Sequence, residues 1–236
     1  MSIFKRLGKI LVIFIMGVIS LLICVFLIFN EKRPKLEQSA MADQLAEKML
    51  NAIHHKAYIN TRYLEWTFAG KNRYRWDKQQ QVVDVSWDVY RVVLNIQQPD
   101  ISTVFLNQNK VKDKTKFNII EKAIANFNND SFWLVAPQKI FDPGTERGIV
   151  HLKNGEKALL VNYTSGGNTP GDSYVWYLDE SGLPLAFKMW VSIIPIGGLK
   201  ATWDNWQITE SGVLLPSNHT LVALDISMGD VKAWND

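Results

Sequence analysis

The strongest hydrophobic pattern in the chain is an uninterrupted apolar run near the N-terminus. Residues 10–29 (ILVIFIMGVISLLICVFLIF) contain no charged side chain. At about 1.5 Å per residue they would form about 30 Å of helix, enough to span a bilayer core. A cleaved signal peptide would have a shorter apolar region with a small-x-small site close behind it, whereas here the polar residues 30–34 (NEKRP) follow. The run predicts an uncleaved transmembrane anchor after a short basic tail, residues 1–9.

The apolar positions take a helical period after a charged linker, residues 30–38. Apolar side chains then recur every four positions, at Met41, Leu45, Met49 and Ile53. This spacing is typical of one face of a helix, and Ser39 is a suitable N-cap. We expect a helix from Ser39 to about Ile53 that packs this stripe on the core.

From Thr61 onward the period changes to two. Apolar and polar side chains alternate in four successive segments, with apolar positions at Leu64, Trp66 and Phe68, at Tyr74 and Trp76, at Val83, Val85 and Trp87, and at Val92, Leu94 and Ile96. Strict alternation broken by short polar turns is typical of antiparallel strands with one covered face. This part of the chain predicts an antiparallel meander.

A helical passage then interrupts the strands. One face of it carries Phe117, Ile120, Ile124 and Phe127. We expect this helix to end near Asp130, whose side chain would cap a second, short apolar helix (SFWLVAP) that Pro137 closes.

Strand patterns resume in the C-terminal half of the chain. They are GIVHLKN, EKALLVNYT, SYVWYLD, LAFKMWVSII, KATWDNWQIT and HTLVALDIS. Together with the earlier segments they predict an α+β fold, in which a strongly curved antiparallel sheet forms a half-open barrel wrapped around a few helices. One transmembrane helix precedes this fold, and residues 39–236 form a single domain.

The charge of the chain is divided between the anchor and the domain. The net charge of the 236 residues is +3, but residues 1–35 contain six Lys or Arg and one acid, a contribution of +5. The remaining 20 basic and 22 acidic residues give −2 for the domain. The basic balance therefore belongs to the anchor and gives no reason to expect a nucleic-acid partner.

The cysteine count and the flanking charges bear on location. Cys24, inside the apolar run, is the single cysteine of the chain, so the domain has no disulfide and no thiol ligand. Three Lys or Arg precede the run and three follow it. The N-terminal amine tips this balance towards a cytoplasmic N-terminus. We expect a single-pass protein of the inner membrane whose large domain faces the periplasm or the outside.

The stretch TSGGNTPGDSYVWYL, residues 164–178, resembles a phosphate-binding loop at first sight. Gly166 and Gly171 have the spacing of that loop, but Asp172 occupies the position of the required Lys. The alternation of SYVWYL predicts a strand where the loop needs a helix. We therefore expect residues 165–172 to be a hairpin connection. The next turn, DESGLP, places Gly182 where a positive φ is needed.

The histidines and acids give no pattern for catalysis. His54 and His55 are adjacent, so they cannot share a metal ion as an i, i+4 pair would. His151 and His219 lie far away in the sequence, and no G-x-S-x-G motif is present. We expect a protein that is not an enzyme and that needs no metal or cofactor.

Aromatic residues are the remaining candidates for function. The residues that could line a hydrophobic ligand cavity are Trp66, Phe68, Trp76, Trp87, Phe132, Trp133, Trp176 and Trp190. Such residues either fill a core or surround a cavity between a curved sheet and its helices, and composition does not separate the two.

Two stretches resemble a known family. FNNDSFWLVAPQKIFDPG, and GGNTPGDSYVWYLDESGLPLAFKMW with ATWDNWQI after it, resemble a widespread bacterial family of uncharacterised envelope proteins. Its signature is N-D-x-F-W-L-x-A-P-x-K-x-x-D-x-G, followed by G-G-x-T-P-G-D-x-Y-x-x-Y-x-D-x-x-x-G-L-P. The match covers about residues 128–206. It implies a domain of unknown function and no assigned activity.

The order of elements is also similar to that of the lipoprotein carrier and outer-membrane lipoprotein-sorting (LolA/LolB-like) superfamily. That resemblance implies a half-open barrel that shelters acyl chains in an apolar cavity. This chain differs because it keeps a membrane anchor, which favours holding or handing on a ligand near the membrane.

These observations lead to one preferred function and two alternatives. We expect a membrane-anchored extracytoplasmic protein that binds a lipid or a lipoprotein acyl chain. One alternative is a structural or interaction module of the envelope with a filled core. The other is a glycan-binding domain, which would need several Trp exposed as flat platforms beside polar side chains.

Overall fold

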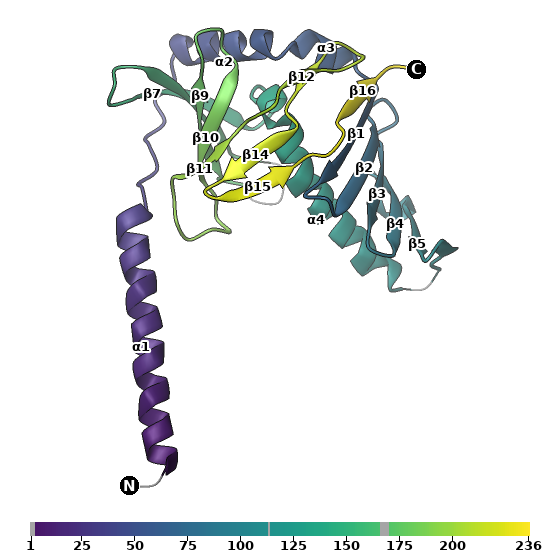
Figure 1. The fold of residues 1–236 in the computed structure, drawn as a ribbon. Coiled ribbons are helices and arrows are strands. Elements are labelled where there is room, and N and C mark those ends of the chain that lie inside the picture. The colour runs from purple at the N-terminus through teal and green to yellow at the C-terminus, as the bar shows by residue number, and fades with distance from the viewer. Residues whose placement is uncertain (1–2, 113, 166–169) are drawn as a thin grey trace.

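The computed structural model describes residues 3–112, 114–165 and 170–236 (Figure 1). The first helix, α1 (Ile3–Phe29), projects away from the rest of the chain. By length and composition its part Leu7–Phe29 is long and apolar enough to cross a membrane, and none of it is buried. The expected N-terminal apolar helix is therefore confirmed.

Two helices follow, α2 (Ala40–Ala52) and α3 (His55–Asn60). Ser39 caps α2 as expected, because its Oγ accepts a hydrogen bond from the Ala42 amide at 3.3 Å. The predicted apolar stripe is only partly correct. Ala42, Ala46 and Met49 face the core, whereas Met41 is 46% exposed. The face of α2 that lies on β7 and β8 is the one with Ala42, Ala46 and Met49, and Met41 lies outside it, with its Sδ 3.0 Å from Nζ of Lys157 of β8.

Sheet A contains seven antiparallel strands in the order β16-β1-β2-β3-β4-β5-β6. Their bounds are β1 Tyr63–Phe68, β2 Asn72–Asp77, β3 Val82–Trp87, β4 Tyr90–Asn95, β5 Thr103–Leu106, β6 Asn109–Lys110 and β16 Lys232–Trp234. A 3-10 turn, η1 (Pro99–Ile101), precedes β5. Since β1 to β4 each pair with the next strand, the predicted meander is confirmed.

A long helix, α4 (Lys116–Val135), and a 3-10 turn, η2 (Ala136–Lys139), follow sheet A. The prediction of two helices separated at Asp130 is wrong, because α4 runs through this position without a break. The Asp130 side chain is buried, and it accepts hydrogen bonds from Tyr74 and Asn72 of β2 rather than capping a new helix. Of the predicted helix face, Ile120 and Phe127 are buried.

Sheet B also contains seven antiparallel strands, in the order β15-β14-β11-β10-β9-β8-β7. Their bounds are β7 Thr145–His151, β8 Lys157–Tyr163, β9 Ser173–Leu178, β10 Pro184–Trp190, β11 Leu199–Thr202, β14 Asn218–Leu221 and β15 Leu224–Ser227. A small separate ribbon joins β12 (Gln207–Ile208) to β13 (Leu214–Leu215).

Two predicted strands of the C-terminal half are each divided in the structure. KATWDNWQIT contains β11 and β12, with Asn205 between them at a φ of 53°. HTLVALDIS is a hairpin of β14 and β15 that turns where Val222 has a φ of 58°. Positive φ is uncommon for residues other than Gly, so local alternation gave no sign of these turns.

The two sheets meet at one corner and do not close into a barrel. At that corner the Thr67 amide of β1 donates to the Met228 carbonyl at 3.0 Å, and the Ala69 amide donates to the Ser227 carbonyl at 2.8 Å. The strands β6 and β7 are the opposite edges of the two sheets. The α+β class with antiparallel sheets is therefore confirmed, with two joined sheets in place of one curved sheet.

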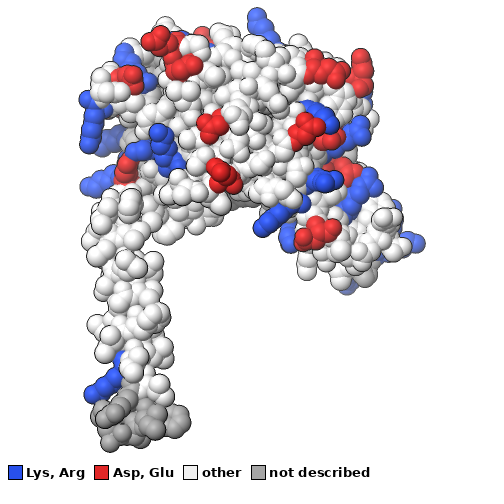
Figure 2. Space-filling view, viewed as in Figure 1, with Lys and Arg blue, Asp and Glu red and all other residues white. Residues whose placement is uncertain are grey.

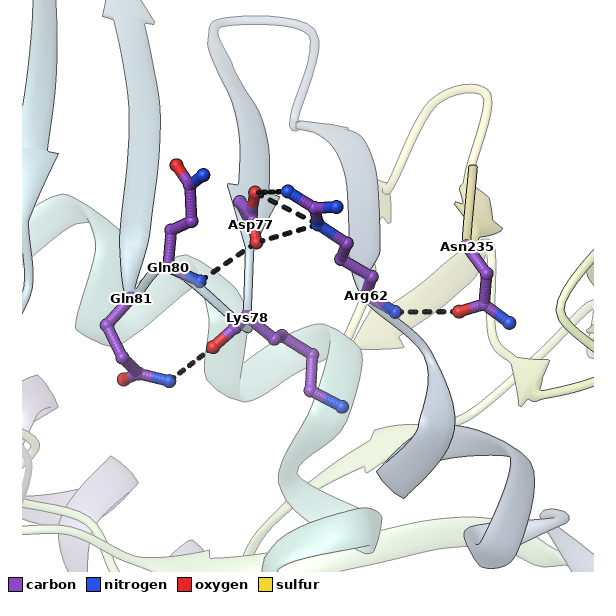
Figure 3. A network of polar contacts seen from close by, with 6 residues as sticks. All are labelled: Arg62, Asp77, Lys78, Gln80, Gln81 and Asn235. Atoms are coloured by element: carbon purple, nitrogen blue, oxygen red, sulfur yellow. Dashed lines mark hydrogen bonds and ion pairs between the residues drawn. The ribbon is translucent and has the colours of Figure 1, made fainter.

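A polar network ties the C-terminus to one end of sheet A (Figure 3). Arg62 donates to both carboxylate oxygens of Asp77, with Nη2 3.0 Å from Oδ2. The Gln80 amide also donates to Asp77, and the Arg62 amide donates to the Asn235 side chain at 2.9 Å. Partial burial raises the pKa of Asp77, but the hydrogen bonds from Arg62 and Gln80 lower it overall.

The linker, residues 30–38, lies on the outer face of sheet B. The Glu31 amide donates to the Gly197 carbonyl at 3.0 Å, and the Gly197 amide donates to the Asn30 side chain at 2.9 Å. The Glu31 carboxylate pairs with Lys188 of β10 at 2.6 Å. Since Asn30 directly follows α1, these contacts fix the end of α1 against the domain.

Candidate functional site

The interior between the two sheets contains the aromatic residues, and α4 crosses it (Figure 1). On the sheet A side, the rings of Trp66 and Tyr74 stack with centroids 4.6 Å apart. Trp76 meets Phe127 of α4 edge-on at 5.2 Å, and Phe127 also contacts Trp66 at 6.3 Å. Alternation along β1 and β2 turns these side chains inward, as the pattern predicts.

On the sheet B side, a larger aromatic group surrounds the C-terminal part of α4. Phe187 of β10 contacts Trp176, Trp133 and Trp203 at 5.2, 5.6 and 5.9 Å. Phe132 of α4 lies 4.6 Å from Tyr174 of β9. Both aromatic groups belong to one buried cluster, which we call the inner aromatic site.

The inner aromatic site contains polar atoms that are buried without a partner. Among the described residues, seven buried side-chain atoms have no hydrogen bond: Nε1 of Trp66, Trp76, Trp87, Trp176 and Trp203, the hydroxyl of Tyr163, and Nε2 of His219. Buried polar groups in folded proteins are nearly always hydrogen-bonded. Such a group of unpaired polar atoms among packed aromatic rings is therefore unusual for a core.

Among these unpaired atoms, Nε2 of His219 in β14 is a hydrogen-bond acceptor. Its Nδ1 lies 3.0 Å from the Thr202 carbonyl oxygen, so Nδ1 carries the proton and Nε2 presents a lone pair. The ring is fully buried and packs on Trp203 at 4.6 Å and on Trp133 at 5.4 Å. Burial lowers the pKa of His219 to about 4, although the carbonyls of Thr202 and Trp133 and the Asp204 carboxylate oppose the shift. The ring is therefore neutral at pH 7.

Along α4, Asp130 lies between Phe127, which contacts the aromatic group of sheet A, and Phe132, which contacts that of sheet B. Its Oδ2 accepts from the Tyr74 hydroxyl at 2.5 Å and from Asn72 at 2.7 Å. Burial, followed by the nearby Asp130 carboxylate, raises the pKa of Tyr74. Burial likewise raises the pKa of Tyr163 and of Tyr174. These phenols stay protonated at neutral pH, so they can donate hydrogen bonds but do not act as bases.

The structure brings most of the predicted cavity residues together. Trp66, Trp76, Trp133 and Trp176 are buried in the inner aromatic site, and Phe132 and Phe68 are half-buried against it. Trp87, at the end of β3, is also buried, and it stacks on Tyr90 with Lys122 of α4 5.6 Å from its ring.

Trp190 is the exception, and its assignment to the cavity is wrong. In β10, Phe187 and Met189 face the interior, so Lys188 and Trp190 point to the outer face of sheet B. Trp190 packs there in a second hydrophobic cluster, and its Nε1 donates to the Glu31 carbonyl at 2.8 Å. Its role is to hold the linker.

Several residues of the inner aromatic site were missed from sequence. They are Tyr163, Phe187, Trp203 and His219, which lie on or beside four strands of sheet B. Alternation within β10 would have identified Phe187, since it lies two positions from Met189. The inward position of His219 depends on a hairpin that the sequence pattern did not reveal.

A second feature is a hollow on the outer face of sheet A. It has a volume of about 350 Å³ and includes Glu65, Thr67, Arg73, Arg75 and Asp84 in its lining. Beside it the rings of Tyr63 and Trp234 stack at 5.2 Å, with the Arg75 guanidinium 5.5 Å from the Trp234 ring. This face combines an aromatic pair with charged side chains.

Apart from the adjacent His54 and His55, the histidines lie on different elements. His54 Nδ1 contacts the Gly212 carbonyl and His55 contacts Gln138, each at 2.9 Å. His151 is exposed at the end of β7, and His219 is buried in sheet B. Within the part of the chain that the structure describes, no three His, Cys, Asp or Glu gather as a metal site would require.

The glycine-rich stretch is only partly described, because residues 166–169 lie outside the described residues. On either side of them, β8 and β9 form a hairpin, and the Gly171 amide donates to the Tyr163 carbonyl at 2.7 Å. The predicted strand after Asp172 is confirmed as β9. In the next turn Gly182 has a φ of 99°, and Asp179 accepts from the Ser181 and Leu183 amides.

Comparison with known proteins gives a distant structural likeness. No family model matches the chain, and no curated protein matches it. Among solved structures, the chain is similar to a DUF1329 family protein from Desulfovibrio piger ATCC 29098, with 10% sequence identity and a TM-score of 0.38. The likeness covers 81% of this chain and 92% of that protein. At this TM-score it carries no argument about function.

Proposed function

We propose that the chain is a membrane-anchored extracytoplasmic binding protein that holds one hydrophobic ligand, a lipid or a lipoprotein acyl chain, in the inner aromatic site. The observation that carries this proposal is the set of seven unpaired polar atoms on the buried aromatic walls. Sites for small ligands combine apolar walls with a few polar groups that fix orientation. The inner aromatic site has both.

The free energy of the unpaired polar groups favours a bound ligand over a core without one. Each buried donor or acceptor without a partner costs about 1–3 kcal/mol. An acyl chain with an ester or carboxyl group supplies acceptors for the indole N–H groups of Trp176 and Trp203. A carboxylic acid or hydroxyl group also supplies a donor for Nε2 of His219.

The open architecture supports a route for such a ligand. The sheets meet at the corner where β1 lies beside β15, and α4 crosses the interior between them. Rearrangement of α4 against the sheets would admit a chain without breaking sheet pairing. The proposal draws on the resemblance to the lipoprotein carrier superfamily, whose half-open barrels shelter acyl chains, although this chain has two joined sheets in place of one curved sheet.

The anchor supports action beside the membrane. In this proposal α1 spans the inner membrane with Lys5, Arg6 and Lys9 on its cytoplasmic side. The linker contacts at Glu31 and Gly197 then hold the domain close to the outer surface of that membrane. The role proposed is binding and handing on, without catalysis or a cofactor.

Titration with a fluorescent fatty acid tests this function. We expect the full-length protein in detergent to bind the probe at about one molecule per chain, with quenching of its Trp emission because the probe lies among the indole rings. Competition by unlabelled fatty acid should reverse the signal. Absence of saturable binding would refute the proposal.

A second function is favoured by the outer face of sheet A. The hollow at Arg73 and Arg75, beside the stacked Tyr63 and Trp234, suits an interaction module or a glycan-binding surface. Protein partners recovered by cross-linking at Arg75, or binding of envelope glycans lost in Trp234→Ala, would favour this function over the first.

A further inference from the structure

The end of sheet A at β5 and β6, with the N-terminal part of α4, carries a concentrated positive charge. We call β5, β6 and the described residues 111, 112 and 114–122 the distal lobe. Residues 110–122 (KVKDKTKFNIIEK) contain five Lys and two acids, a net charge of +3. Residues 36–236 as a whole carry −2. The distal lobe is therefore opposite in charge to the rest of the domain.

The lysines of the distal lobe are open to solvent. Lys110, Lys112, Lys114 and Lys122 are exposed and Lys116 is half-buried. Among the described residues, none of the five forms an ion pair with a carboxylate. Apolar side chains accompany them, since Leu106 is 37% and Phe117 is 46% exposed. Ile101, just before β5, is 64% exposed.

The distal lobe and α1 point to the same side of the molecule. In Figure 1, β5 and the N-terminal end of α4 extend in the direction in which α1 leaves the domain. Figure 2 shows the same arrangement as an arch with two projections, and Lys and Arg side chains lie around the margin of the lobe, with an acidic side chain on the face in view. Hydrogen bonds between the linker and Gly197 fix the end of α1 within this arch.

We propose that the distal lobe is a second membrane contact, which binds the anionic headgroups of the bilayer that α1 spans. Basic segments close to a membrane are attracted by anionic lipids, and apolar side chains among them enter the interface. Lys110, Lys112 and Lys114 contact the headgroups, and Phe117 enters the boundary between headgroups and acyl chains. The inference rests on the proposed anchoring by α1, and it adds a lipid-dependent contact that α1 alone does not require.

For the proposed function, the consequence is that the domain has a defined orientation on the membrane. With α1 and the distal lobe both on the bilayer, the domain stands over the membrane on two supports. The helix α4 crosses the inner aromatic site, and its N-terminal end, in the distal lobe, then lies at the lipid surface. A ligand leaving the bilayer would therefore meet α4, the helix that crosses the inner aromatic site.

The test uses full-length protein in nanodiscs with a fluorescent label on a single cysteine. Asn118 of α4 is exposed and lies beside Phe117, so Asn118→Cys in a Cys24→Ser background places the label on the distal lobe. Ile59→Cys, on α3 at the opposite side of the domain, is the control position. Quenching by spin-labelled lipid is compared between phosphatidylcholine discs and discs with about one third phosphatidylglycerol, the anionic component to which basic segments bind.

We expect quenching at position 118 to be at least about twofold stronger in the anionic discs and to fall as salt is raised, because salt screens headgroup attraction. The label at position 59 should stay unquenched. Lys112→Glu with Lys114→Glu should abolish the lipid dependence, whereas the matched pair Lys56→Glu with Lys153→Glu, at exposed positions outside the lobe, should leave it unchanged.

The labelled native Cys24 separates this inference from the proposed anchoring. Quenching at Cys24 with none at position 118 in anionic discs would overturn the lobe contact and leave the anchor intact. Absence of quenching at Cys24 would overturn both. Equal quenching at 118 in the two lipid compositions, or no effect of the Lys112 and Lys114 reversals, would also overturn the inference.

Discussion

The hydroxyl oxygen of Tyr74 in sheet A lies 2.5 Å from Oδ2 of Asp130, a carboxylate in the C-terminal half of α4. Both side chains are buried, and Asn72 donates to the same carboxylate oxygen. This contact joins two elements 56 residues apart in the chain. It fixes how α4 crosses the inner aromatic site.

The first prediction concerns this contact. Asp130→Ala should lower the free energy of unfolding by about 2–4 kcal/mol, because it leaves the Tyr74 hydroxyl buried without an acceptor. Asp130→Asn keeps an acceptor oxygen and should recover most of the loss. Urea unfolding of the full-length protein in detergent measures both. Glu121→Ala, an exposed acid on the same helix, should change stability by less than about 0.5 kcal/mol. Equal effects of Asp130→Ala and Glu121→Ala would contradict this account of α4.

The second prediction compares two tryptophans that differ in hydrogen bonding. Trp203 Nε1 is buried without a partner, whereas Trp206 Nε1 donates to the carbonyls of Pro184 and Trp203 at 3.0 and 3.1 Å. Trp203→Phe should weaken fatty-acid binding by about 5–10-fold, the loss of one hydrogen bond of about 1 kcal/mol. Trp206→Phe should lower stability by a similar free energy and leave the affinity unchanged. Unchanged affinity in Trp203→Phe would show that its indole N–H does not meet a ligand.

The third prediction is a pH dependence of stability from His219. Its pKa is about 4 in the folded chain against 6.5 for a free side chain, so folding favours the neutral ring. The stabilisation is complete above pH 6.5 and is lost as the pH falls towards 4, a total on the order of 3 kcal/mol. Urea unfolding between pH 7 and pH 4 should show this slope in the natural chain. His219→Asn cannot take up the proton and should lack that part of the slope; parallel curves for the two proteins would exclude His219 as its source.

The fourth prediction concerns the linker. A Cβ at Gly197 would lie 2.4 Å from Cδ1 of Trp190 and 2.8 Å from the Glu31 carbonyl oxygen. Gly197→Ala should therefore displace the linker from sheet B and make it several-fold more sensitive to proteolysis, while the domain core keeps its stability. Gly17→Ala, where no atom lies within 4 Å of the added Cβ, is the control. Unchanged proteolysis of Gly197→Ala would mean that these contacts do not hold the linker.

The sequence was sufficient for features governed by local periodicity. The apolar helix, the capped helix after Ser39, the meander of sheet A and the inward position of Trp66 and Trp76 all follow from periods of two or 3.6. The strand after Asp172 follows in the same way. Each of these features depends on residues a few positions apart.

Features that depend on distant partners were beyond local reasoning. From its sequence neighbours alone, Asp130 is a suitable helix cap. Its carboxylate instead accepts a hydrogen bond from Tyr74, which belongs to β2, and α4 continues through this position. Trp190 could have been placed outward, because it shares a face with Lys188 two positions earlier. Its attachment to Glu31 required the linker to fold back on sheet B.

The aromatic character of the candidate site was predictable from the sequence, but not all of its residues were. Aromatic residues on alternating strands indicated an aromatic interior, and most of the named residues lie in it. The unpaired atoms of Trp203 and His219 depend on how β11 and β14 pair across a turn with positive φ, which no local pattern encodes. Hydrogen-bond satisfaction is a property of the folded chain and cannot be read from composition.

Native mass spectrometry of the full-length protein, extracted gently from membranes and released from detergent, tests the central claim most directly. The account predicts a population of chains that carries one lipid or fatty-acid molecule, and it predicts that Trp176→Phe combined with Trp203→Phe reduces this population while the protein stays folded. A natural chain that is released at its bare mass, with no lipid adduct under conditions that preserve known lipid complexes, would contradict it.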